Sequence, residues 1–212
     1  MNSKSKISAA SLKRLPQYLR VLKDAQKQEV EFISSTAIAN ELKLNPIQVR
    51  KDLAFVSKTD GRPGVGFEVK ELIKNLEDFL GLKNSVDAII VGAGRLGHAL
   101  MNYSRFENDI KIIGAFDNDS NKCDNKKVFN IIEMEKLLEN RHIDIGIIAV
   151  PKEEAQKVCD QIVNCGIKAV WNFAPANISV PDDVVLKNED LSASLSILLK
   201  MVEEMSKKKR KK

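Results

Sequence analysis

The stretch VGAGRLGHAL, residues 91–100, determines how the second half of the chain folds. Its glycines, Gly92, Gly94 and Gly97, form the pattern G-x-G-x-x-G, and the apolar run VDAIIV comes directly before it. In such a pattern the first glycine allows a tight turn, the second lets phosphates approach the backbone, and the third lets the helix pack on the strand. The stretch therefore predicts a strand–turn–helix unit whose helix start binds the phosphates of a dinucleotide.

An acidic residue completes the candidate nucleotide site. Asp117 follows Gly97 by 20 residues, at the end of the apolar run IKIIGAFD, where a carboxylate accepts hydrogen bonds from the adenosine ribose hydroxyls. Because such a carboxylate repels a 2′-phosphate, NAD(H) is favoured over NADP(H). The alternative is a glycine turn that serves helix–strand packing alone. The turn contributes these candidate residues: Gly92, Ala93, Gly94, Arg95, Leu96 and Gly97.

Strand-like apolar runs alternate with helical stretches from residue 86 onward. The runs are VDAIIVG, IKIIGAFD, IDIGIIAV and AVWNFA, with a weaker DVVLK later, and helices are expected near 94–105, 133–140 and 152–165. This alternation predicts an α/β fold with a Rossmann-like, doubly wound parallel sheet. The last stretch predicts an apolar helix, one side of which holds Leu195, Leu198, Leu199 and Val202.

The first half of the chain shows helical periodicity. In SLKRLPQYLRVLKDA, Leu12, Leu15, Leu19 and Leu22 recur at three- and four-residue steps, which places them on one helical face. Pro16 fits this helix near its start or at a kink. The first half is therefore expected to fold around helices rather than strands.

Two short helices joined by KLN form a helix-turn-helix candidate. Ser34 or Ser35 is expected to cap the first, and Asn45 caps the second, with Pro46 at its first helical position. The turn-rich TDGRPGVGFEV that follows ends extended, as a β-wing does, and a further helix ends at Gly81. In the second helix the expected inward residues are Ile47, Val49, Leu53 and Val56, and the outward ones are Gln48, Arg50 and Lys51.

Composition and charge favour a soluble, cytoplasmic chain with a polyanionic partner. No apolar run approaches a membrane span and no signal peptide opens the chain. Three cysteines match no metal spacing, so idle or buried thiols are expected. Residues 1–84 hold 15 Lys and Arg against 10 Asp and Glu, whereas residues 85–206 hold 13 against 19. The tail KKKRKK, 207–212, is expected to be disordered, either attracting phosphate or only solubilising the chain.

Groups that would transfer a proton during hydride transfer are not found in the sequence. The Tyr-x-x-x-Lys arrangement fails for both tyrosines, because Leu22 follows Tyr18 by four residues and Glu107 follows Tyr103 by four. His98 and His142 are interpreted as structural or exposed. The chain is therefore expected to bind its nucleotide without turning it over.

The combination of these motifs resembles the Rex family of redox-sensing transcriptional repressors. The resemblance covers the chain from about Lys13 to Met205, and its most specific pieces are RLPQYLR, QVRKDL, GVGF, the glycine turn and NFAP. It implies a homodimer with a swapped last helix, bound to an inverted-repeat operator on double-stranded DNA when NADH is scarce and released by NADH. The implied domains are a winged helix (1–84), a Rossmann domain (85–190), a dimerisation helix (191–206) and the tail.

Residues of the first half fit operator binding. Arg50 and Lys51 could reach base edges or phosphates in the major groove, with Gln48 as a lesser candidate, and Arg62 in the wing could lie along the minor groove. Gly64 of the wing is included in this set. The alternative for each is a solvated surface position. The family wing carries two adjacent basic residues where this chain has Arg62-Pro63, which affects the expected wing affinity.

The resemblance also implies further cofactor contacts and a switch between domains. Tyr103 is expected near the nicotinamide. Asp190 is expected to pair with Tyr103 in one state and with Arg14 of the partner's winged helix in the other, the alternative being a helix cap. The remaining implied cofactor residues are Val150, Pro151, Asn172, Phe173 and Ala174.

Two other classes remain open from the sequence. The second half by itself resembles CoA-binding domains, which share the glycine turn, although CoA carries a 3′-phosphate and needs no acceptor like Asp117 for a ribose diol. An oxidoreductase with unrecognised proton donors is the other alternative. Substrate-dependent oxidation of NADH would support it.

Overall fold

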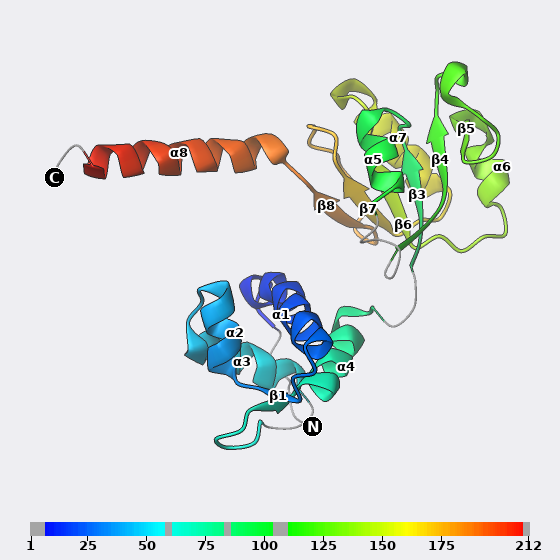
Figure 1. The fold of residues 1–212 in the computed structure, drawn as a ribbon. Coiled ribbons are helices and arrows are strands. Elements are labelled where there is room, and N and C mark those ends of the chain that lie inside the picture. The colour runs from blue at the N-terminus through cyan, green and yellow to red at the C-terminus, as the bar shows by residue number, and fades with distance from the viewer. Residues whose placement is uncertain (1–6, 58–60, 83–85, 104–109, 210–212) are drawn as a thin grey trace. The chain divides into compact units, whose positions relative to one another are not determined.

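The computed structural model describes residues 7–57, 61–82, 86–103 and 110–209. Contacts between Cα atoms divide the chain into two units, Met1–Asn84 and Ser85–Lys212. In the first unit, helices carry most of the described residues, and two short strands pair antiparallel, Phe32 opposite Glu68 and Ile33 opposite Phe67 (Figure 1). Its elements are α1 (Ala9–Lys27), β1 (Phe32–Ile33), α2 (Ser35–Leu42), α3 (Pro46–Val56), β2 (Phe67–Glu68) and α4 (Val69–Leu80).

The helix ends in the first unit are set by local side chains. Ser34 caps α2 by accepting from the Ala37 N–H at 3.0 Å, and Asn45 caps α3 by accepting from the Ile47 N–H at 2.9 Å. Gly81 closes α4 in the left-handed conformation, with φ of 75°. These boundaries confirm the predicted helix-turn-helix, and of the two candidate serines the structure selects Ser34.

The core of the first unit corrects two sequence-based expectations. Of the four leucines that the spacing places on one helical face, Leu15, Leu19 and Leu22 are buried, but Leu12 is 45% exposed. The buried face of α1 is centred on Ser11 and Leu15, and each step along a helix turns the side chain by about 100°, so that Leu12 falls beside that face.

A similar correction applies to α3. Val49, Leu53 and Val56 are buried as predicted, whereas Ile47 is 59% exposed. Ile47 precedes Val49 by two residues, which places it about 200° away around the helix. It therefore shares the outer face of α3 rather than the core.

The second unit is a six-stranded sheet in the order β5-β4-β3-β6-β7-β8, and all five pairings are parallel. Counted within the unit, this is the doubly wound order 3-2-1-4-5-6. The predicted fold class is confirmed, but the sequence missed the short strand β5. The strands are β3 (Val86–Val91), β4 (Ile110–Asp117), β5 (Val128–Asn130), β6 (Ile145–Ile148), β7 (Ala169–Asn172) and β8 (Val185–Asn188).

Three helices of the second unit, α5, α6 and α7, are shorter than the sequence suggested. The stretch expected near 94–105 is helical over seven residues, and the stretch expected at 152–165 begins with a 3-10 turn. The helices are α5 (Arg95–Met101), α6 (Met134–Leu138), α7 (Ala155–Asn164) and α8 (Leu191–Lys209), with 3-10 turns η2 (Ser120–Lys122), η3 (Ile131–Glu133) and η4 (Lys152–Glu154).

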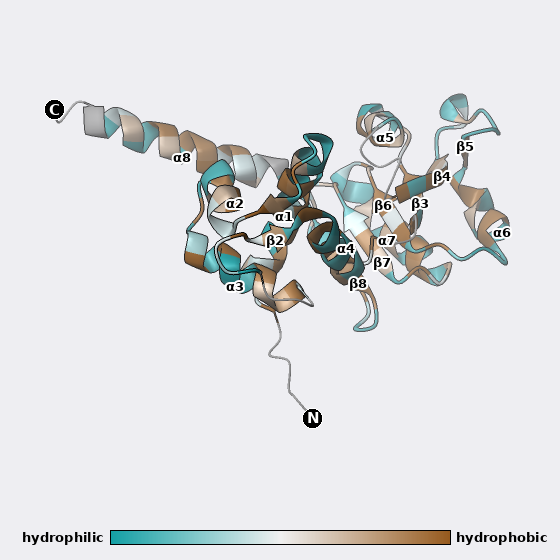
Figure 2. Ribbon diagram, turned by 60° about the horizontal axis from the view of Figure 1, so that its bottom comes forward, coloured by the Kyte–Doolittle hydropathy of each residue, from teal (hydrophilic) through white to brown (hydrophobic). Residues whose placement is uncertain are grey.

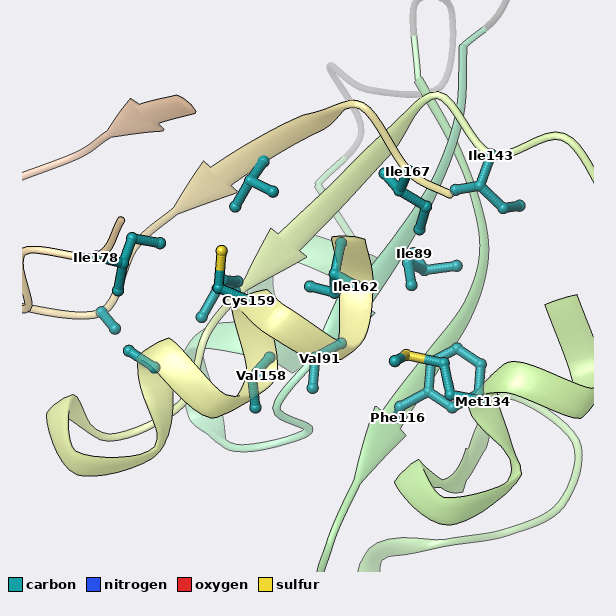
Figure 3. Packing of buried hydrophobic residues seen from close by; sticks show 14 of the residues in the cluster. Ile89, Val91, Phe116, Met134, Ile143, Val158, Cys159, Ile162, Ile167 and Ile178 are labelled. Atoms are coloured by element: carbon teal, nitrogen blue, oxygen red, sulfur yellow. The ribbon is translucent and has the colours of Figure 1, made fainter. Parts of the chain in front are cut away.

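Both faces of the sheet are buried at its centre. Alternation along β3 sends Ile89 and Val91 into one cluster and Ala88 and Ile90 into the other, and all four are at most 1% exposed. Figure 3 shows the first of these clusters, where Ile162 of α7 packs against the sheet. This double coverage fixes the carboxyl ends of β3 and β4, from which the glycine turn and Asp117 emerge.

Helix α8 carries apolar side chains that the single chain leaves uncovered. Its predicted apolar side is exposed, between 52% for Val202 and 60% for Leu199, and Figure 2 shows hydrophobic turns along its length. The helix continues to Lys209, and Glu203 pairs with both Lys200 and Lys207. The expectation of a disordered tail is therefore wrong for residues 207–209, because the acidic turn before them supports the helix.

Candidate nucleotide site and DNA-facing surface

A cavity of about 670 Å³ opens beside the glycine turn. Ile131, Ile132 and Lys122 line it, and no sequence pattern indicates these three residues. The sequence-predicted residues that line it are Gly92, Gly94, Arg95, Leu96, Asp117, Val150 and Pro151.

Two glycines of the turn are required by the chain itself. Gly92 has φ of +107°, and a Cβ there would lie 2.4 Å from the Ala149 carbonyl oxygen. A Cβ at Gly97 would lie 1.8 Å from the Gly92 carbonyl oxygen. Both contacts are with backbone that cannot move aside, so any larger residue disrupts the turn.

Gly94 differs from its neighbours in the turn. Its φ is −80°, and a Cβ built there has no described atom within 4 Å. The fold therefore does not need a glycine at this position. Gly94 lines the cavity, so the space that a side chain would fill is space for a ligand beside the backbone. This geometry fits the pyrophosphate of a dinucleotide.

Asp117 lies at the end of β4 and is 5% exposed. Its Oδ2 accepts from the Ala93 N–H at 2.7 Å, its Oδ1 accepts from the Asp119 N–H at 2.9 Å, and the Lys122 ammonium lies 3.1 Å from Oδ2. Burial would raise the pKa of Asp117, but these hydrogen bonds outweigh it and hold the pKa below the usual value. The carboxylate is therefore ionised at neutral pH and acts as an acceptor. Ala93 itself is buried and contributes its N–H to this arrangement.

Ile131 and Ile132 form an apolar wall of the cavity next to Asp117. They belong to the turn η3 that follows β5, and Ile132 is 85% exposed. An isoleucine this exposed at a cavity is suited to stacking on a planar apolar ligand group such as an adenine ring. The sequence signal that could have found it is the run VFNII, whose strand is too short to show a period.

Six predicted cofactor residues are not among those that line this cavity: Ala93 and Gly97 of the turn, and Tyr103, Asn172, Phe173 and Ala174. Asn172 is fully buried, and its side-chain nitrogen donates to the carbonyls of Ala174 and Ala176 at 3.2 and 3.1 Å and to the Asn188 side chain. The Phe173 ring lies 4.9 Å from the Trp171 ring. Asn172 thus shapes the chain where β7 ends.

Ala174 and Asp190 line a second cavity of about 600 Å³. The Asp190 carboxylate accepts from the Ala193 N–H at 2.8 Å, so it caps the start of α8. Tyr103, which follows α5, is 47% exposed. The capping alternative therefore describes Asp190 within the single chain, and its pairing with Tyr103 stays a prediction.

The outer face of α3 presents two cations to solvent. Arg50 and Lys51 are exposed. Lys51 lies on the side opposite the buried Val49 and Leu53, and Arg50 lies at the edge of that buried face. Gln48 is also exposed, but its amide nitrogen donates to Asp52 Oδ1 at 2.9 Å. The Gln48 side chain is therefore bound to Asp52 of the same helix. Arg50 and Lys51 are the charged groups of α3 that are directed outward.

A polar cluster, which we call the Asp52 cluster, joins α1 to α3. Asp52 is 3% exposed, and its Oδ2 accepts from Arg14 Nε and from the Tyr18 hydroxyl, each at 2.8 Å. Burial would raise the pKa of Asp52, but hydrogen bonds from Arg14, Tyr18, Gln48 and Ser11 lower it below the usual value. The same burial, together with Asp52, raises the pKa of Tyr18 to about 12.

The wing is a tight turn between Arg62 and Gly66, whose backbones exchange hydrogen bonds of 2.8 and 2.9 Å. The Arg62 guanidinium lies 5.1 Å from the centre of the Phe32 ring, a cation–π contact. Gly64 at the tip has φ of +75°, and a Cβ at Gly66 would lie 2.4 Å from the Ile33 carbonyl oxygen. Phe32 thus holds the one wing arginine in place, a role that the sequence did not indicate.

Within the described ranges, no group of three His, Cys, Asp or Glu side chains could hold a metal ion. The cysteines Cys123, Cys159 and Cys165 are free thiols, and burial raises the pKa of each. No helix among these residues has the length and apolar character needed to span a membrane.

Comparisons with known proteins cover both units. A family model described as "Putative DNA-binding protein N-terminus" matches residues 6–54, and one described as "CoA binding domain" matches residues 83–176. A redox-sensing transcriptional repressor Rex from Clostridium beijerinckii is 41% identical over 96% of this chain and 99% of its own length. The Rex of Treponema denticola is 43% identical over 92% of this chain and 96% of its own length.

Solved structures give the same result. The crystal structure of RSP, a Rex-family repressor, in complex with β-NAD+ and operator DNA has a TM-score of 0.87, at 38% identity over 98% of each chain. The structure of RSP with β-NADH has a TM-score of 0.85, at 37% identity over 98% of this chain and 100% of the other. The CoA-binding match describes the glycine-turn half by itself, whereas these relatives match both halves.

A helix-turn-helix unit joined to a doubly wound nucleotide-binding unit defines a class of transcriptional regulators that carry their own ligand sensor. The chain belongs to the Rex family of redox-sensing transcriptional repressors. The expectation of a regulator rather than an enzyme is thereby confirmed. The predicted family is confirmed as well.

Proposed function

We propose that this protein is a transcriptional repressor that senses the NADH/NAD+ ratio, occupies an inverted-repeat operator when NADH is low and leaves it when NADH binds. The observation that carries the proposal is Gly94, a glycine that lines the cavity and that the fold itself does not require. The relatives support it, since the solved RSP complexes contain NADH in one case and NAD+ with operator DNA in the other.

Different residues of the cavity bind different parts of the cofactor. The turn at Gly94 and Arg95 receives the pyrophosphate, Asp117 accepts from the ribose hydroxyls, and Ile131 with Ile132 faces the adenine. NAD(H) supplies the redox signal, because its two oxidation states differ in charge and shape at the nicotinamide. Val150 and Pro151 lie at the carboxyl end of β6 and extend the cavity, and the remaining candidates for the nicotinamide end are Tyr103, Asn172, Phe173 and Ala174.

Operator contacts come from the exposed face of α3 and from the wing. Arg50 and Lys51 supply base-edge or phosphate contacts in the major groove, where an α-helix fits. Gln48 acts by holding α3 through Asp52. Arg62, held over Phe32, and the backbone at Gly64 meet the adjacent minor groove.

A second copy of the chain covers α8. The exposed leucines of this helix need a partner surface, and a two-fold dimer matches the symmetry of an inverted-repeat operator. Helix exchange brings the Asp190 of one copy toward the partner's winged helix, where it competes with Asp52 for Arg14. Such a regulator acts in the cytoplasm, where the free thiols stay reduced.

Fluorescence anisotropy on a labelled pool of candidate inverted repeats tests this function. The salt concentration is held fixed, because phosphate contacts make the affinity depend on salt. We expect sequence-specific binding that NADH releases and that NAD+ protects. Tight NADH binding without an effect on any DNA would contradict the repressor function and favour the oxidoreductase alternative.

A further inference from the structure

Lys122 occupies the part of the nucleotide site that a ribose diol needs. It belongs to the turn η2, five residues after Asp117, and lines the same cavity. Its ammonium lies 3.1 Å from Oδ2 and 3.2 Å from Oδ1 of Asp117, so it spans both oxygens of the carboxylate. The Lys122 side chain is 41% exposed, whereas that of Asp117 is 5% exposed.

The other partners of Asp117 are fixed by the fold. The Ala93 N–H belongs to the glycine turn and the Asp119 N–H to the loop after β4, and neither can leave without moving backbone. A carboxylate offers about four acceptor positions, and these two amides with Lys122 engage all of them. A ribose diol that binds Asp117 must therefore take over the positions held by Lys122, whose flexible stem lets it withdraw.

Because Lys122 and Asp117 line the same cavity, an ammonium that leaves Asp117 can remain near a ribose that binds this carboxylate. Asp117 by itself repels a 2′-phosphate, and a lysine within hydrogen-bond distance of the carboxylate offsets that repulsion and attracts phosphate as a compact charge. The charge of the cavity lining is consistent with this effect, since Arg95, Lys122 and Lys157 outnumber Asp117 and Glu154.

We propose that Lys122 is a specificity-determining residue. It releases Asp117 to the ribose diol of NAD(H) and it attracts the 2′-phosphate of NADP(H). It thereby reduces the preference of the site for NAD(H) over NADP(H). The inference rests on the proposed function, because it assumes that this cavity holds the dinucleotide. It goes beyond the assignment of Asp117, which by itself predicts rejection of NADP(H).

Isothermal titration of NADH and of NADPH into the full-length protein tests the proposal. In Lys122→Ala we expect the NADPH dissociation constant to rise about tenfold, as for loss of one charge-assisted hydrogen bond. The NADH dissociation constant should change less than about threefold, because loss of Lys122 has two opposing effects. Asp117 loses a hydrogen-bond partner, and the ribose diol no longer has to displace Lys122 from Asp117. The effect of Lys122→Ala on the NADPH dissociation constant should come closer to its effect on the NADH constant at 0.5 M salt, because salt screens the attraction between Lys122 and the phosphate.

Lys126→Ala is the matched control, because it removes the same charge from the same exposed loop and Lys126 is not among the residues that line the cavity. Lys122→Gln keeps a donor for Asp117 without the charge and should widen the NADH preference as the alanine variant does. An NADPH-to-NADH ratio equal in Lys122→Ala and Lys126→Ala would overturn the proposal, as would a wild-type protein that binds NADH and shows no binding of NADPH. Failure of the wild type to bind NADH would instead contradict the proposed function.

Discussion

Asp52 in the first unit and Asp117 in the second are both nearly buried, at 3% and 5% exposed, yet their partners differ in kind. Asp52 is held by side chains from α1 and α3, so its hydrogen bonds join two helices. Asp117 is held by two backbone amides and by one half-exposed lysine that faces a cavity. Asp52 therefore joins two helices, whereas Asp117 has one side-chain partner, Lys122, that lines a cavity.

The largest expected effect is on the stability of the first unit. Asp52→Ala leaves the Arg14 guanidinium and the Tyr18 hydroxyl without their acceptor, and breaking such a pair costs roughly 3 kcal/mol of unfolding free energy. Urea unfolding followed by circular dichroism measures it. Asp24→Ala, which removes an exposed carboxylate from α1, is the control. Equal stability of the two variants would show that the cluster does not join the helices.

The corresponding change in the second unit should affect binding and not stability. Gly94→Val adds a side chain where the chain has free space, so we expect unchanged urea unfolding and an NADH dissociation constant raised by about 100-fold or more. Calorimetric titration of NADH measures it. Gly114→Ala, whose added Cβ would meet only ordinary contacts with Phe129, serves as control. A variant that binds NADH normally would place the pyrophosphate elsewhere.

The exposed cations of α3 come next in size. We expect Arg50→Ala combined with Lys51→Ala to weaken operator binding by tens of fold and to lower the slope of log affinity against log salt by about 2 if both meet phosphates. Anisotropy at several salt concentrations measures both. The pair Lys70→Ala and Lys74→Ala on α4 removes the same charge from the same unit. If this control pair lost as much affinity, the contact surface would not be α3.

The smallest effect concerns acid stability. The pKa of Asp52 is lowered in the folded chain, so its contribution is fully present at neutral pH and is lost as the pH falls below the unfolded value of 3.8 toward the folded one. The wild-type first unit should therefore lose more stability between pH 5 and pH 2 than Asp52→Ala does. Acid titration of the urea midpoint checks this. If the urea midpoints of the wild type and of Asp52→Ala fell equally between pH 5 and pH 2, the partners of Asp52 would not stabilise its ionised form.

The same two aspartates show what the sequence could predict. The position of Asp117 at the cavity could be predicted, because a strand end at a fixed distance from the glycine turn is a short sequence pattern. Asp52 was not found, since its partner Arg14 is 38 residues away and only the packing of α1 on α3 brings them together. The QVRKDL motif contains Asp52 without indicating what it binds.

Local signals also explain the other differences. Helix caps at Ser34 and Asn45 and the strands β3 and β4 follow from spacing along the chain, and they were predicted. Strand β5 has three residues, too few for a period, so the Ile131–Ile132 wall behind it was missed. Lys122 was missed for a similar reason, because no motif marks a lysine five residues beyond Asp117.

The central claim, that the Gly94 cavity controls operator binding, is tested most directly by titrating NADH into operator-bound protein, wild type beside Gly94→Val. We expect equal operator affinity in the absence of NADH, release of the wild type by NADH, and a variant that stays bound at the same NADH concentrations. Release of both proteins at the same NADH concentration would contradict it.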